Sequence, residues 1–386
     1  MSQYASHSSS DPSINQESKP VTGWKRHHKE FEHVLGIQPK FELLISSPDT
    51  PFAHEAGVYF ESEDVLFVTS NRLVENGKNG LEKSQHVQIS RIDLSQFRRK
   101  GSGLATRDEI SGGSIQMGNG GVNYQDGILF CAQGSDMSPS GLVWMSKSAP
   151  FQTKAIVTSY HGVQFNSVND VVVSKLDGSI WFTDPTYGHE QGYKASPSLP
   201  SQVYRYIPDE NGGYGSIRAV VDGFGHPNGL CFSPDESTLY ITDTDKVHGS
   251  GHIRSDRPSS IYAFDVIRRH GHPMVCNRRL FAFVEAGIPD GIKCDTDGRV
   301  YSGCGDGIHV WSESGVPLGR FQIAGGVANF CFGRPGEIFA LNEHHLWRVS
   351  IASSIQGALL ADLPTHAKGR RKITTMVRNG LRNVFC

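Results

Sequence analysis

The stretch Gly162–Gly188, GVQFNSVNDVVVSKLDGSIWFTDPTYG, decides the fold. It holds a polar turn that ends at Asn169, an apolar run at 171–173, the dipeptide Asp177-Gly178 and a second apolar run. Asp-Gly between two apolar runs is a strong hairpin signal, because the turn needs positive φ at its central residues. The stretch therefore predicts a β-hairpin that carries an amide, Asn169, at its mouth.

The same arrangement recurs along the chain. The distance from the polar residue to the second strand is 11 residues in the copies that begin at Glu55, Asn169 and Asn228, and 10 residues in the copy at Asp290. Repeats at a fixed period indicate a repeat architecture. Six copies can be counted, and their polar positions are Glu55, Asn119 or Asn123, Asn169, Asn228, Asp290 and Asn329.

Further strands are predicted after each hairpin, which makes four short antiparallel strands per copy. Six such units predict an all-β, six-bladed β-propeller around a central channel. We expect the strand Phe41–Ser46 to complete the last sheet, and the long excursions at 71–85, 184–201 and 243–259 to form lids or pocket walls. Residues 1–38 are expected to form a flexible polar tail, and residues 39–386 a single propeller domain with strands near Leu359 and Ile373.

Composition excludes several classes of function. There are 37 Lys and Arg residues against 39 Asp and Glu residues, and no basic stripe for nucleic acid is present. Seven cysteines are an odd number, and four of them fall in apolar strand runs, so a disulfide framework is not expected. The sequence shows no apolar leader and no run long enough to cross a membrane. We therefore expect a cytoplasmic protein with no membrane partner, and the oligomeric state stays open.

The polar positions predict a metal site. The first strand of each propeller blade lines the channel, so Glu55, Asn169, Asn228 and Asp290 should meet at one mouth of it. Hard oxygen donors suit Ca²⁺ best, with Mg²⁺, Mn²⁺ or Zn²⁺ as alternatives. Asn and Asp also cap turns without binding anything, and that explanation fits Asn119 and Asn329 equally well. It does not fit Glu55, since Glu is a poor turn residue.

Three phrases resemble a known family. NSVNDVVVSKLDGSIWFTDPTYG, HPNGLCFSPDESTLYITDT and IPDGIKCDTDGRVYSGCGDG are similar to the senescence marker protein/gluconolactonase/regucalcin family, in particular its fungal lactonohydrolase branch, over about 52–341. The resemblance implies a six-bladed propeller with one catalytic divalent metal. It implies that Glu55, Asn169 and Asn228 are metal ligands, and that Asp290 is both a ligand and the general base or nucleophile. Sugar-lactone members carry an arginine where this chain has Ser167, so the substrate is not implied.

We therefore expect a metal-dependent lactonase that hydrolyses the ester bond of a small-molecule lactone, with the metal as Lewis acid and Asp290 as base or nucleophile. The alternatives are a metal-dependent aryl-ester or phosphotriester hydrolase, a non-hydrolytic cyclase or isomerase of fungal secondary metabolism, and a scaffold propeller. Substrate contacts are expected, more weakly, from His54, Ser167, Tyr187, His226 and Asn329, whereas His248 and His252 are expected to be solvated loop residues.

Overall fold

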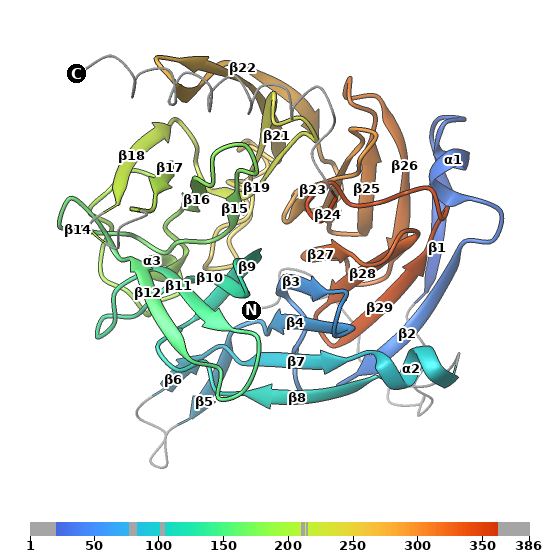
Figure 1. Ribbon diagram of the computed structural model, residues 1–386, viewed down its shortest axis with the longest axis horizontal. Helices are drawn as coiled ribbons and strands as arrows, with labels where there is room; N and C mark the ends of the chain where they lie inside the picture. Colours follow the sequence, from blue (N-terminus) through green and yellow to red (C-terminus); the bar gives the residue numbers. More distant parts are fainter. Residues whose placement is uncertain (1–20, 77–82, 101–104, 210–212, 214, 362–386) are drawn as a thin grey trace, which may run out of the picture.

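The computed structural model describes residues 21–76, 83–100, 105–209, 213 and 215–361, and its sheets are arranged in a ring (Figure 1). Six antiparallel sheets form the ring, which confirms the predicted six-bladed propeller. Blade 1 contains β3 (Glu55–Phe60), β4 (Val65–Thr69), β7 (Ile89–Asp93) and β8 (Thr106–Ile110); blade 2 contains β9 (Gly118–Tyr124), β10 (Gly127–Ala132), β11 (Gly141–Ser146) and β12 (Thr153–Val157).

The remaining blades follow the chain in the same order. Blade 3 contains β15 (Val171–Val173), β16 (Ile180–Asp184), β17 (Gln202–Ile207) and β18 (Ser216–Val221), and blade 4 contains β19 (Pro227–Phe232), β20 (Thr238–Asp243), β21 (Ser260–Arg269) and β22 (His272–Phe283). Blade 5 contains β23 (Ile292–Cys294), β24 (Val300–Cys304), β25 (Gly307–Trp311) and β26 (Pro317–Ile323), and blade 6 contains β27 (Asn329–Phe332), β28 (Glu337–Asn342) and β29 (His345–Ser350).

Smaller elements lie in the connections. They are the hairpins β5 (Leu73–Asn76) with β6 (Lys83–His86) and β13 (Ser159–Tyr160) with β14 (Val163–Gln164), and the helices α1 (Phe31–Leu35), α2 (Ser95–Lys100) and α3 (Tyr187–Glu190). No helix in the described part of the chain is long and apolar enough to span a membrane.

The second strand of a blade is buried on both faces. Every residue of β4 (VLFVT) and of β16 (IWFTD) is buried, and the same is true of β24. Such a strand packs against the neighbouring blade on each side, so its sequence is a continuous apolar run without alternation. The hydrophobic core is therefore divided into clusters that lie between blades, as the set Ala56, Phe67, Ile128 and Phe130 between blades 1 and 2 illustrates.

The ring is closed by the N-terminal part of the chain. Strand β2 (Lys40–Ser46) pairs with β29 and supplies the fourth strand of blade 6, which confirms the strand predicted at 41–46. Residues 1–38 were expected to form a flexible tail, but residues 21–38, which the structure describes, contain a strand and a helix. Strand β1 (Thr22–Arg26) adds a fifth strand to blade 5 beside β26, and α1 buries Phe31 and Val34 against the core. Residues 1–20 lie outside the described residues.

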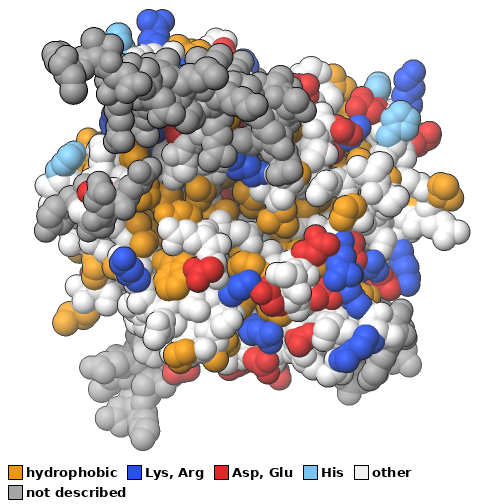
Figure 2. Space-filling model, in the orientation of Figure 1, with side chains coloured by type: hydrophobic (Ala, Val, Ile, Leu, Met, Phe, Trp, Pro, Cys, Tyr) orange, Lys and Arg blue, Asp and Glu red, His pale blue; other side chains and the backbone are white. Residues whose placement is uncertain are grey.

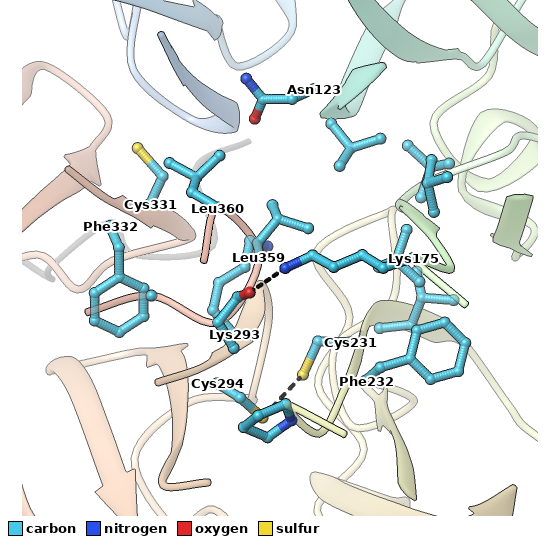
Figure 3. Close-up of a pocket in the computed structure, with 18 of the residues that line it drawn as sticks. Asn123, Lys175, Cys231, Phe232, Lys293, Cys294, Cys331, Phe332, Leu359 and Leu360 are labelled. Carbon is cyan, nitrogen blue, oxygen red and sulfur yellow. Dashed lines mark hydrogen bonds between the residues drawn. The ribbon is translucent and has the colours of Figure 1, made fainter. Parts of the chain in front are cut away.

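An apolar pocket lies at the end of the channel opposite the polar residues that precede the inner strands. It is lined by residues from all six inner strands, among them Cys231, Phe232 and Cys294 (Figure 3). Leu359 and Leu360 reach into it from a turn, so the strand predicted near Leu359 is wrong, and Ile373 lies outside the described residues. Hydrophobic side chains also gather near the centre of the face shown in Figure 2.

The junction between blades 6 and 1 is also held by charge. Arg98 of α2 donates two hydrogen bonds to the carboxylate of Glu337 on β28, at 2.7 and 2.8 Å. Arg348 on β29 donates a third through Nε at 2.8 Å. Burial opposes ionisation, but the two guanidinium groups hold the pKa of Glu337 below its ordinary value of 4.5.

We predict that Glu337→Gln lowers the free energy of unfolding at neutral pH by about 2 kcal/mol, because the half-buried guanidinium groups of Arg98 and Arg348 each lose one of their two carboxylate partners. The folded-state pKa of Glu337 is lowered, so the stabilisation is present above pH 4.5 and disappears as pH falls through that folded pKa. Urea unfolding of the parent chain and the variant at pH values above and below 4.5 measures this difference in the free energy of unfolding. The matched change Glu109→Gln, at an exposed ion pair with Arg107, should cost less than about 1 kcal/mol. Equal losses for both variants at neutral pH would contradict the prediction.

Candidate metal centre at the mouth of the channel

The structure brings the four predicted metal ligands into one cavity. Glu55, Asn169, Asn228 and Asp290 line a cavity of about 50 Å³ at the channel mouth, and all four are buried. They come from four blades: Glu55 begins β3, Asn169 precedes β15, Asn228 lies in β19 and Asp290 precedes β23. Equal positions in a radial repeat therefore meet although they are far apart in the sequence. His54, Asn119 and Tyr187 line the same cavity.

Several oxygen atoms in this cavity have no hydrogen-bond partner among the described residues. The Oδ1 atoms of Asn169, Asp290 and Asn119 are buried and unpaired. A buried acceptor without a partner costs about 1–3 kcal/mol, so such atoms usually mark an ion or an ordered water. Converging unpaired oxygens fit a hard divalent cation, and Asn119 joins the four predicted donors as a fifth candidate.

The electrostatics of the cavity agree with that fit. Burial, and then the charge of Glu55, raise the pKa of Asp290 well above its ordinary value. Burial also raises the pKa of Glu55, and the charge of Asp170 adds to the effect. A cation between the two carboxylates would offset both effects, since it favours their charged forms. The described residues thus hold more buried negative charge at this mouth than they neutralise.

His54 and Asn329 support the carboxylates in different ways. The His54 Nδ1 lies 2.7 Å from Glu343 Oε1. Burial lowers the pKa of His54, but the charges of Glu343 and Glu55 outweigh it and raise this pKa to about 9. Asn329 Nδ2 donates to Glu55 Oε2 at 2.6 Å, so Asn329, which is absent from the cavity lining, orients a predicted ligand.

A threonine on the second strand of one blade holds the polar residue of the next blade. The threonine hydroxyl donates a hydrogen bond to the backbone carbonyl of the polar residue. This bond helps to set the position of the polar side chain along the channel axis. The sequence analysis missed this role, although the recurring Thr at the end of the second strand was its signal. The pairs are Thr69 with Asn119 at 3.0 Å, Thr183 with Asn228 at 2.7 Å and Thr242 with Asp290 at 3.1 Å.

A second missed signal is the dipeptide Thr-Asp at the ends of β16 and β20. Asp184 accepts the backbone N–H groups of Asn166 and Ser167 at 3.0 and 2.8 Å, and Asp243 accepts those of Gly225 and His226. Each carboxylate thereby shapes the loop that leads to Asn169 or Asn228. Ser167 is fully buried, donates to Pro185 O and accepts from Gly188 N, so the structure places it away from the cavity lining.

A glycine follows the polar residue in several blades because the inner strands pass very close to one another. A Cβ on Gly291 would lie 2.2 Å from Asn329 Oδ1, and one on Gly229 would lie 2.4 Å from Asp290 O. Only a residue without a Cβ fits these positions.

Gly291→Ala should therefore lower the free energy of unfolding by about 1–3 kcal/mol, because the added methyl group overpacks the contact between residue 291 and the Asn329 side chain. Thermal unfolding measures the loss. Gly23→Ala is the matched control, since a Cβ there meets nothing within 4 Å. If both variants unfold at the same temperature as the parent chain, the inner strands are not in the close contact described.

Three side chains capable of binding metal lie just outside the cavity. Glu190, His226 and His248 offer ligand atoms that all lie within 4.8 Å of one another. His226 Nε2 lies 2.5 Å from Glu190 Oε1, and its Nδ1 lies 2.9 Å from Asp245 Oδ1. Burial lowers the pKa of His226, but the two carboxylates raise it overall. His226 was predicted to contact substrate and His248 to be solvated, whereas the structure joins them in one cluster.

The cluster is connected to the cavity through Tyr187. The ring of Tyr187 stacks on His226 with centroids 5.0 Å apart, and its hydroxyl contacts Thr244 Oγ1. Tyr187 and Glu190 both belong to α3, so one short helix supplies a cavity wall and a member of the cluster.

Comparison with known proteins shows the family of this chain and agrees with its fold. The chain belongs to the SMP-30/gluconolactonase/LRE-like family, whose sequence pattern matches residues 121–338. The lactonohydrolase oryL of Aspergillus oryzae is 30% identical over 336 residues, which cover 82% of this chain and 71% of that protein. The gluconolactonase of Zymomonas mobilis is 28% identical over 240 residues, covering 56% of this chain and 62% of its own length. A gluconolactonase structure from Xanthomonas campestris superposes with a TM-score of 0.64 at 25% identity, over 88% of this chain and 99% of that one.

Proposed function

We propose that this protein is a metal-dependent lactonase that hydrolyses the ester bond of a small-molecule lactone. The observation that carries the proposal is the buried cavity in which Glu55, Asn169, Asn228 and Asp290 converge and in which Asn169 Oδ1 and Asp290 Oδ1 lack a partner among the described residues. Family membership supports it, since the curated relatives are a lactonohydrolase and a gluconolactonase by name.

The donor set favours Ca²⁺, with Mg²⁺ or Mn²⁺ next. All four donors are oxygen atoms, and the imidazole that lines the cavity, His54, is engaged by Glu343. Zn²⁺ fits this mouth less well, because it prefers nitrogen and sulfur ligands. When bound, the cation would act as a Lewis acid on the lactone carbonyl.

In this proposal Asp290 performs the chemistry. As a carboxylate, it either takes a proton from the attacking water or attacks the carbonyl carbon itself. The imidazolium of His54 favours the ionised form of Asp290, because a nearby positive charge lowers a carboxylate's pKa. Asn169 and Asn228 are neutral donors, so they would add no negative charge to the two that Glu55 and Asp290 bring.

Asp290→Asn should reduce lactone hydrolysis by about 10²–10⁴-fold or more, because an amide can neither accept the proton nor attack. The rate is measured on a panel of lactones, aryl esters and phosphotriesters by titrating the acid that hydrolysis releases at constant pH. The matched change Asp256→Asn, on an exposed loop, should keep the full rate. A variant at position 290 that hydrolyses lactones as fast as the parent chain would refute the proposed role, and faster turnover of phosphotriesters than lactones by the parent chain would refute the substrate class.

Removal of divalent metal should abolish hydrolysis and lower the melting temperature, because the imidazolium of His54 is then left to offset the charges of both Glu55 and Asp290. Dialysis against a chelator, followed by return of Ca²⁺, Mg²⁺ or Mn²⁺ one at a time, tests this. We expect Ca²⁺ to restore both activity and melting temperature at the lowest concentration. Activity that is indifferent to the chelator would rule out the metal-dependent mechanism.

A further inference from the structure

The cluster of Glu190, His226 and His248 has the chemistry of a second metal site, different from that of the channel. Two of its three donors are imidazole nitrogens, and imidazole suits Zn²⁺ and similar transition metals, whereas calcium prefers oxygen. We propose that Glu190, His226 and His248 bind one Zn²⁺ ion beside the catalytic cavity. This proposal does not rest on the lactonase assignment.

The orientation of the two histidine rings supports the site. His226 Nε2 and His248 Nδ1 face the same atom, Glu190 Oε1, at 2.5 and 3.9 Å. Donor atoms of a tetrahedral zinc ion with bonds of about 2.0–2.1 Å lie about 3.3 Å apart. The two separations lie on either side of that value, and the ligand atoms of the three residues all lie within 4.8 Å of one another.

The opposite ring nitrogens face a single carboxylate. Asp245 Oδ1 lies 2.9 Å from His226 Nδ1 and 3.6 Å from His248 Nε2. A histidine that ligates a metal usually donates its other N–H to a carboxylate, which fixes the tautomer and the ring orientation. His248 Nε2 is also buried without a hydrogen-bond partner among the described residues, and closure of the site onto a metal would bring it to Asp245.

The Glu190 carboxylate is held in place for this role. Its Oε2 accepts the backbone N–H of Gly249 at 2.5 Å, and its Oε1 accepts the hydroxyl of Thr186 at 3.1 Å. The His248 side chain is 28% exposed and that of Glu190 18%, which leaves a route for an ion from solvent.

Zinc at this position would join two pocket walls. Glu190 lies on α3, whereas His248 lies on the connection between β20 and β21. His226 precedes β19 and stacks on Tyr187, which lines the catalytic cavity. A metal bound by all three would therefore fix Tyr187 and reduce the independent motion of the two connections.

The test measures zinc binding to chelator-treated protein that has been reloaded with excess Ca²⁺, by competition with a chromogenic chelator and by elemental analysis after dialysis. We expect one zinc ion per chain. His248→Ala should weaken its affinity by at least about 100-fold, and Asp245→Asn by about 10–100-fold. His189→Ala, an exposed histidine next to Glu190 on the same helix, is the matched control and should bind zinc as the parent chain does.

Two further measurements separate this site from the channel. Asp290→Asn should retain the zinc ion, and Co²⁺ in place of zinc should give the visible bands of a tetrahedral complex that vanish in His248→Ala. Melting temperatures without zinc establish that each variant is folded. The proposal is overturned if the parent chain binds no stoichiometric zinc, if His248→Ala binds it equally well, or if Asp290→Asn abolishes the binding.

Discussion

The channel and its polar mouth require a closed ring of blades. The channel mouth exists only when blade 6 meets blade 1, and strand β2 makes that contact by pairing with β29. The same junction contains the hydrogen bond from Asn329 of blade 6 to Glu55 of blade 1. An opened ring would therefore lose part of its core and would also release one of the proposed metal ligands.

The polar channel mouth is the electrostatically unfavourable part of an otherwise apolar assembly. Glu55, Asp170 and Asp290 are buried together, and burial raises the pKa of each carboxyl group. Natural sequences tolerate such local conflicts mainly at functional sites. The threonine hydroxyls and strand-end aspartates around the mouth hydrogen-bond the backbone that carries the polar side chains. A preorganised set of donors of this kind suits the binding of a cation.

The outer cluster shows how a propeller adds chemistry without altering its blades. The connections between strands carry Glu190 and His248, while the ring supplies His226 and the wall residue Tyr187. Because α3 contributes to both the cavity and the cluster, an ion bound outside the channel would act on the cavity through Tyr187 and through Gln191, which follows Glu190. The two centres differ in donor type, so each would select its own metal.

The sequence by itself determined the six blades, the closing strand at 41–46 and the residues that meet at the channel mouth. These features follow from a repeat, and equal positions in a closed radial repeat must converge. The tertiary structure was needed to show that the residues before the first blade form β1 and α1, and that the Ser167 side chain bonds within its own loop. It was also needed to show that Leu359 lies in a turn and that Glu190, His226 and His248 meet. Those outcomes depend on connections of unequal length whose residues have no counterparts in other blades, so no periodicity in the sequence reports where they lie.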